Sequence, residues 1–177
     1  MSNTPRALPP PSGPICWISE SLLEGAIAVS QSSPRRRVIQ PLHRAESADL
    51  HRMFNAVQPD SYIPPHRHLD PPKAESWIVL RGALAFFTFD EQGRVEECLE
   101  IRAGGAVFGV DLEPGVYHTF FALEPDTVVF EVKSGPYSPS NDKTFPEWAP
   151  PEGSSSASKY LAWLKSVFAQ RSSTKSA

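Results

Sequence analysis

Two histidines that stand one residue apart are the residues of this sequence whose types and spacing most readily suggest chemistry. His66 and His68 lie in "PPHRHLDPPKAESWIVLRG", residues 64–82. If this stretch is extended, residues two apart point to the same face, so the two imidazoles lie side by side. Two imidazoles on one face can bind one metal ion, with nitrogens about 2.0–2.1 Å from the ion if it is zinc. An exposed polar strand edge is the alternative interpretation of this pair.

Two further residues can complete such a site. Glu75 opens an apolar run after "LDPPKA", whose prolines can reverse the chain, and His118 follows the Pro-Gly turn of "EPGVYHTFF". Three imidazoles and one carboxylate would leave positions on a divalent ion open for water or substrate. His43 and His51 have no comparable setting, and we expect them to be structural or exposed.

The residues that must position this group are expected to form strands. From residue 61 on, short runs rich in β-branched and aromatic residues are separated by turn sequences. The predicted strands cover 61–69, 75–90, 94–101, 106–111, 116–124 and 127–133. Such short, regularly spaced strands favour an antiparallel barrel or sandwich. Helical spacing of apolar residues predicts short helices over 18–32 and 47–59 and an amphipathic helix over 158–170.

The two ends of the chain differ from its middle. Residues 1–14 are Pro-rich and are expected to form a disordered tail. We expect one folded domain over 15–150, with a helical lead-in over 15–58 and a β-barrel over 59–150. Residues 151–177 are expected to form a linker, a short amphipathic helix and a polar tail.

Composition narrows the class of protein. The 177 residues carry a formal net charge of -3 and two cysteines, Cys16 and Cys98. The sequence therefore lacks the basic surface typical of nucleic-acid binding, and the three arginines of 33–38 are expected in a solvated turn. It shows no membrane-spanning stretch, no signal peptide and no disulfide framework. We expect a cytoplasmic protein with reduced thiols.

Two short motifs resemble those of the cupins. H-R-H followed by E-S-W-I-V-L-R-G resembles the first cupin motif, and P-G-V-Y-H resembles the second. The match has departures. Asp60 stands in place of the leading glycine, the loop between His68 and Glu75 is long, Pro114 is displaced by one position, and Ala122 replaces an asparagine.

A longer match, over about residues 17–152, resembles the WbuC family of cupin-fold metalloproteins. The resemblance implies an all-β fold, a small jelly-roll or double-stranded β-helix barrel, with short N-terminal helices and a C-terminal helix. It implies one divalent metal ion (Fe, Mn, Ni or Zn) held by His66, His68, Glu75 and His118. Members of the family are associated with lipopolysaccharide O-antigen gene clusters, which implies a sugar or a sugar nucleotide as the small-molecule ligand.

The reaction stays open at this point. A metal-dependent isomerase, an Fe(II)-dependent dioxygenase and a non-catalytic ligand-binding module all fit, and no residue is assigned a catalytic role. Side-chain parity and loop position suggest a set of residues that contact the ligand: Tyr62, Lys73, Trp77, Lys133 and Tyr137. We also expect a homodimer, as cupins of this size often are.

Overall fold

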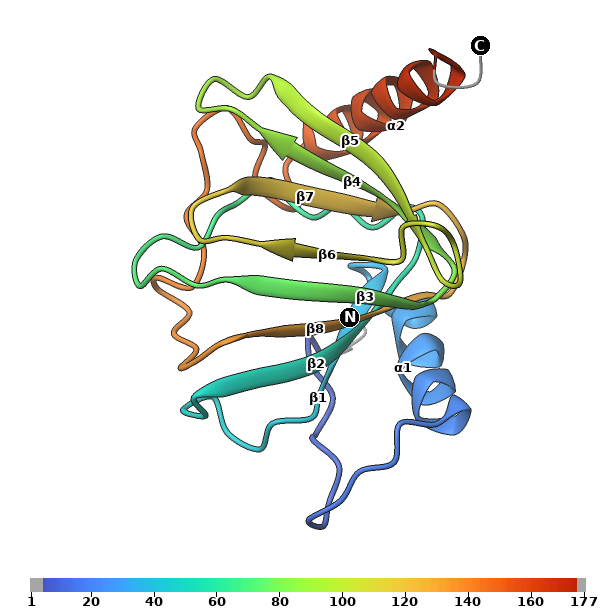
Figure 1. The fold of residues 1–177 in the computed structure, drawn as a ribbon, viewed down its shortest axis with the longest axis vertical. Helices are drawn as coiled ribbons and strands as arrows, with labels where there is room; N and C mark the ends of the chain where they lie inside the picture. Colours follow the sequence, from blue (N-terminus) through green and yellow to red (C-terminus); the bar gives the residue numbers. More distant parts are fainter. Residues whose placement is uncertain (1–4, 175–177) are drawn as a thin grey trace.

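The computed structural model describes residues 5–174, which form two helices and eight strands. The elements, in chain order, are α1 (Glu20–Ser32), β1 (Arg37–Pro41), β2 (Leu50–Val57), β3 (Glu75–Arg81), β4 (Ala83–Phe89), β5 (Val95–Arg102), β6 (Gly109–Leu112), β7 (Tyr117–Ala122), β8 (Thr127–Ser134) and α2 (Ala157–Thr174). Figure 1 shows the strands stacked into one β-structure with a helix at each end.

The strands form two antiparallel sheets. One has the order β1-β2-β8-β3-β6 and the other has the order β5-β4-β7. Both sheets contribute to one apolar core, to which the five-stranded sheet gives Val57, Trp77 and Val129 and the three-stranded sheet gives Phe86 and Phe120. The predicted all-β fold class is confirmed, with the strands in two antiparallel sheets.

The side-chain pattern of strand β3 explains why a candidate site residue points into the barrel. Its side chains alternate strictly, with Glu75, Trp77 and Val79 buried and Ser76 and Ile78 exposed. This alternation follows from the two-residue period of a strand with only one face in the core. The pattern therefore points Glu75 to the same side as the apolar interior.

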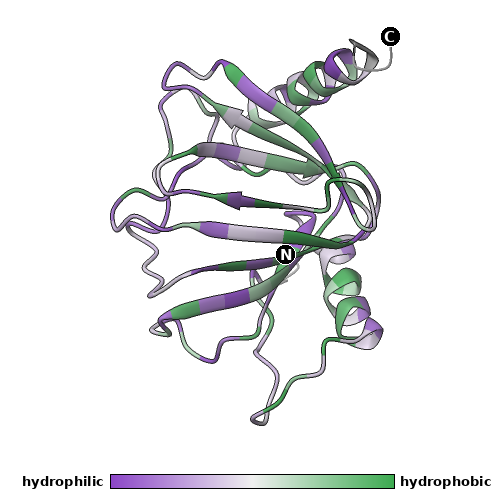
Figure 2. Ribbon diagram, in the orientation of Figure 1, coloured by the Kyte–Doolittle hydropathy of each residue, from purple (hydrophilic) through white to green (hydrophobic). Residues whose placement is uncertain are grey.

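The two helices cover different sheets. Leu23 and Ile27 of α1 pack on Phe54 in the five-stranded sheet, whereas Leu161 and Leu164 of α2 join a cluster on the three-stranded sheet. Each helix carries both hydrophobic and hydrophilic positions, as expected for a helix with one buried face (Figure 2). Neither helix has the apolar length that crossing a membrane would require.

The helix predicted over 47–59 is wrong, because this segment forms β2. Its apolar residues happen to recur at helical spacing, but β2 is covered on both faces. Phe54 packs under α1 on the outer face, and Val57 packs in the barrel core. A strand buried on both faces loses the alternation that would identify it.

The N-terminal segment also differs from the predicted disordered tail. Leu8 donates its N–H to Ile39 at 2.8 Å, and Ile39 donates to the carbonyl of Arg6 at 3.1 Å. The side chain of Gln40 donates to Pro9 at 2.9 Å. Residues 6–9 therefore lie along β1, while residues 1–4 lie outside the described part.

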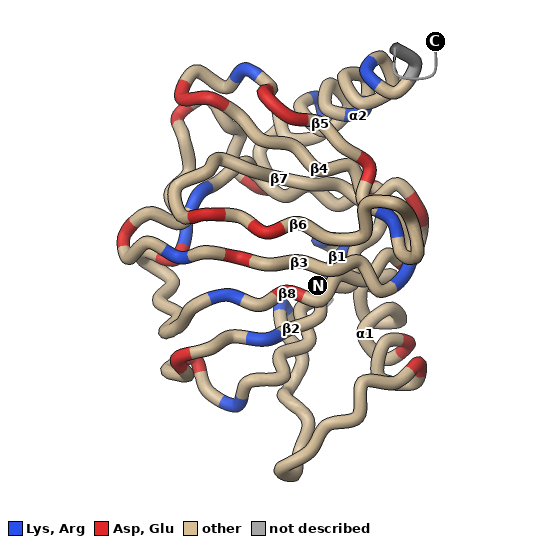
Figure 3. The backbone as a smooth tube through the Cα atoms, in the orientation of Figure 1, with Lys and Arg blue, Asp and Glu red and all other residues tan. Residues whose placement is uncertain are grey.

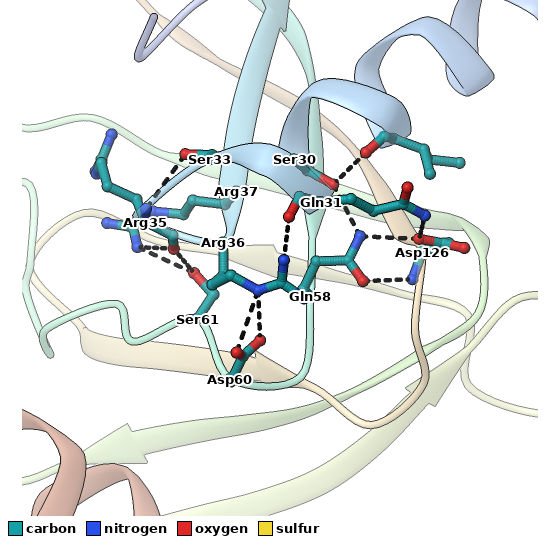
Figure 4. Close-up of polar contacts among 11 residues, drawn as sticks. Ser30, Gln31, Ser33, Arg35, Arg36, Arg37, Gln58, Asp60, Ser61 and Asp126 are labelled. Atoms are coloured by element: carbon teal, nitrogen blue, oxygen red, sulfur yellow. Dashed lines mark hydrogen bonds and ion pairs between the residues drawn. The ribbon is translucent and has the colours of Figure 1, made fainter. Parts of the chain in front are cut away.

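The arginines of 33–38 make ion pairs instead of forming a purely solvated turn. Arg36 lies 3.0 Å from Asp60, the residue at the position of the missing cupin glycine (Figure 4). Arg35 and Arg37 both contact Glu152, at 2.9 and 2.6 Å. These contacts tie the segment before α2 to the turn between α1 and β1.

Candidate metal centre

The histidine pair and His118 are brought together by main-chain pairing. His66 donates its N–H to the carbonyl of His118 at 3.1 Å, and His118 donates back to His66 at 2.9 Å. Residues opposed in this way on antiparallel strands project from the same face. The ring centroids of His66 and His118 lie 4.6 Å apart, and those of His66 and His68 lie 5.3 Å apart.

Glu75 reaches the histidines from the other sheet. Its Oε1 lies 2.9 Å from Nε2 of His68, and its Oε2 lies 3.2 Å from Nε2 of His118. One ring nitrogen from each of His66, His68 and His118 lies within 4.8 Å of the others, and all four residues are buried. Two ligand atoms that meet one ion at a right angle, each about 2.1 Å from it, would be ~3.0 Å apart. The separations between Glu75 and the two imidazoles match that spacing.

Each imidazole is fixed by a main-chain carbonyl. Nδ1–H of His66 donates to Pro64 and that of His118 donates to Val116, both at 2.9 Å. Nδ1–H of His68 donates to the carbonyl of Asp142. A carbonyl can only accept, so each ring carries a proton on Nδ1 and directs Nε2 toward the interior of the site. This is the outer-shell arrangement that orients histidines in metal sites.

The polar atoms facing inward fit a cation. Nε2 of His68, Nε2 of His118 and Oε2 of Glu75 are buried and have no hydrogen-bond partner among the described residues. Burial alone would raise the pKa of Glu75, but its contacts with His118 and His68 outweigh burial and hold the pKa well below the ordinary value. Burial, followed by the charge of Lys143, lowers the pKa of His66 and keeps it neutral. A carboxylate beside three imidazole nitrogens can hold a divalent metal ion.

The two lysines predicted to contact a ligand, Lys73 and Lys133, both pair with a carboxylate of the protein. Nζ of Lys73 and Nζ of Lys133 each lie 2.9 Å from a different oxygen of Asp142. Nζ of Lys133 also lies 3.6 Å from Oε1 of Glu75, so it faces the metal-ligand group as well. All three partners are buried, and charged positions on the adjacent strands β3 and β8 are visible in Figure 3.

The three predicted aromatic contacts fall in different places. The ring centroid of Trp77 lies 5.3 Å from that of His118, and its buried indole N–H has no hydrogen-bond partner within residues 5–174. Tyr62 donates its hydroxyl to Pro150 at 2.9 Å and belongs to the cluster under α2, away from the histidines. Parity fails for Tyr62 because residues 61–65 form no strand. Tyr137 is 37% exposed, and no described contact links its side chain to the histidines.

Sequence reasoning missed Glu131, Asp142 and Lys143. Glu131 stands opposite Trp77 on β8 and accepts from Asn55 at 2.7 Å, and burial followed by the charge of Glu75 raises its pKa. Parity with Lys133 on the same strand would have revealed it. Asp142 and Lys143 lie in the irregular segment after β8, where no period predicts direction.

The remaining histidines form a separate pair. The rings of His43 and His51 stack at 3.9 Å. His51 donates Nε2–H to the carbonyl of Glu46 at 3.1 Å, and His43 contacts the main chain of Arg52. They have the structural role expected from the sequence.

Comparison with known proteins gives a match to a family model over part of the chain and a set of solved structures. Residues 18–101 match a family described as "Domain of unknown function (DUF6016)". No curated protein matches the chain. The WbuC resemblance is matched by neither comparison and stays a prediction.

Solved structures of Bacillus subtilis oxalate decarboxylase are similar to part of the chain. One, determined at pH 4.6, has 20% sequence identity and a TM-score of 0.45, and the alignment covers 56% of this chain and 24% of that chain. Another, concerned with the Mn(II) centres of that enzyme, has 20% identity and a TM-score of 0.44 over the same shares. The chain thus spans about a quarter of the decarboxylase chains it matches.

Proposed function

We propose that His66, His68, Glu75 and His118 hold one divalent metal ion and that a small polar molecule binds to this ion at the barrel mouth. One observation carries the proposal. Three imidazoles, each with Nδ1–H donated to a main-chain carbonyl, present Nε2 toward a buried, charged carboxylate. Side chains that served only packing would not leave these nitrogen and oxygen atoms buried without partners.

The bound metal would act as a Lewis acid on an oxygen of the substrate. The chain's own residues prepare the site for that role. Carbonyls of Pro64, Val116 and Asp142 hold the imidazoles in one tautomer, and the Trp77 and Phe120 rings exclude water from the inner side. The WbuC resemblance supports a sugar or a sugar nucleotide as the substrate class. Fe, Mn, Ni and Zn all suit this nitrogen and oxygen donor set.

The experiment is elemental analysis of untagged protein purified without chelator and then reloaded with each metal in turn. We expect about one ion per chain for the wild type. His118→Ala and Glu75→Gln should lose the ion, because each removes one ligand and leaves the barrel core in place. His43→Gln is the matched control, since it changes a buried histidine outside the site. A folded wild type that binds no metal, or ligand variants that retain it, would refute the proposal.

A further inference from the structure

The direction of Lys143 follows from main-chain pairing at the edge of the site. Arg67 donates its N–H to Thr144 at 3.0 Å, and Thr144 donates back at 2.9 Å. Opposed residues of an antiparallel pair share one face, and their neighbours share the other. The guanidinium of Arg67 lies 4.2 Å from the ring centre of Tyr117, and its neighbours His66 and His68 point into the site. Lys143, next to Thr144, therefore faces the side on which His66 and His68 stand.

The position of Phe145 supports this direction. It flanks Thr144 on the other side, and its ring centroid lies 6.1 Å from that of His66. Phe145 is 55% exposed, and Lys143 is also exposed, so this pair stands where the site meets solvent.

Lys143 differs from the two other lysines of the site. Lys73 and Lys133 share the carboxylate of Asp142. The ammonium of Lys143 makes no ion pair or hydrogen bond with any residue from 5 to 174. Desolvation of that ammonium and its proximity to Lys133 lower the pKa of Lys143 to about 8. Lys143 is thus a cation that faces the site and makes no direct ion pair with the described residues.

The balance of charges around the site favours binding of an anion. Three carboxylates and three ammonium groups gather here: Glu75, Glu131, Asp142, Lys73, Lys133 and Lys143. These six charges balance one another, so a divalent cation would bring uncompensated positive charge. An uncompensated charge in a partly buried site is costly. A ligand with a negative group would offset that charge and give Lys143 a partner.

We propose that Lys143 binds the anionic group, a carboxylate or a phosphate, of the small molecule that binds at the metal. This inference rests on the proposed metal site and names the substrate class for it. An ammonium pairs with either group through charge-assisted hydrogen bonds. Lys143 is a binding residue in this proposal, and the ligand's oxygen atoms at the metal are held by the ion itself.

Calorimetric titration of the metal-loaded full-length protein tests the proposal, with metal content measured on each sample. The probes are glycolate, its uncharged amide glycolamide, and inorganic phosphate. Lys143→Met should weaken binding of the preferred anion by roughly tenfold or more, because a charge-assisted contact is lost. Lys143→Arg should restore most of that affinity, and glycolamide should not distinguish the variants. Lys159→Met, at an exposed lysine of α2, should behave as the wild type.

The titrations with glycolate and with inorganic phosphate distinguish a carboxylate-binding site from a phosphate-binding site. Equal affinity of Lys143→Met and wild type for both anions, at equal metal content, overturns the role of Lys143. If the fully metal-loaded wild type binds neither anion, the proposed role of Lys143 is overturned as well. A wild type that takes up no metal refutes the metal site instead, so the two failures are distinguishable.

Discussion

Asp142 does more for the candidate metal centre than any other residue outside the ligands themselves. Its two carboxylate oxygens each hold a buried ammonium, that of Lys73 and that of Lys133. Its carbonyl accepts from Nδ1–H of His68. One residue therefore links the segment after β8 to the loop before β3, to β8 and to a candidate metal ligand.

The Asp142→Asn substitution should destabilise the fold by about 3–5 kcal/mol, because it leaves the buried ammonium of Lys73 without a charged partner and removes the nearest carboxylate from that of Lys133. Chemical denaturation measures this loss. Glu91→Gln is the matched control, since its ion pair with Arg67 is on the surface and should contribute about 1 kcal/mol or less. Similar losses for both variants would contradict the role of Asp142.

The same residue predicts a dependence on pH. Burial alone would raise the pKa of Asp142, but Lys133 and Lys73 outweigh burial and lower it below the ordinary 3.8. A carboxyl group whose pKa is lower in the folded state contributes stability above its unfolded pKa, and this contribution is lost as pH falls through the folded pKa. The stability difference between wild type and Asp142→Asn should therefore shrink as pH falls below about 3.8.

At the scale of elements, α2 packs on the barrel through an apolar cluster. Leu164, 1% exposed, packs with Phe87 and Phe121 of the three-stranded sheet. The candidate ligand His118 lies on the other face of that sheet, where Phe86 and Phe120 line the barrel core. One face of the three-stranded sheet therefore packs against α2, and the other face contributes to the site.

Leu164→Ala should lower the free energy of unfolding by about 2–5 kcal/mol, since it removes a buried side chain and leaves a cavity. The same substitution at Leu50, which is 50% exposed, should cost about 1 kcal/mol or less. Denaturant titration gives both values, and metal content should stay at the wild-type level in each. Loss of the metal in folded Leu164→Ala would show that α2 supports the site directly.

The elements also explain what the sequence could and could not predict. The direction of Glu75 and Trp77 was predictable because β3 has one face in the core and one in solvent. The strand β2 was not predictable. Helix α1 covers its second face, so apolar residues stand on both faces and do not alternate with polar ones. Tyr62 was misplaced because a two-residue period was applied to residues that form no strand. Asp142 and Lys143 are positioned by pairing across 74 or more residues, which no local pattern encodes.

At the scale of the whole molecule, the four candidate ligands join the two sheets. Glu75 begins β3 of the five-stranded sheet, and His118 lies on β7 of the three-stranded sheet. His66 and His68 come from the segment between β2 and β3 that pairs with β7. An ion bound by all four would add a further connection between the two sheets.

Metal binding should therefore raise the stability of the whole barrel. At a free metal concentration 100 times the Kd, the expected gain in unfolding free energy is about 2.7 kcal/mol. Thermal unfolding at increasing metal concentration measures it, and Leu164→Ala should gain as much as the wild type. His118→Ala should gain nothing, and an equal gain for this variant would mean that the metal stabilises the protein from another place.

The histidines owe their orientation to carbonyl groups of Pro64, Val116 and Asp142. A carbonyl of the main chain is present whatever side chain follows it. Replacing Val116 by another residue thus changes no acceptor, and a scan of single substitutions would overlook a position on which a ligand depends. The orientation of these three imidazoles therefore depends on the backbone conformation and not on the side chains of the residues that supply the carbonyls.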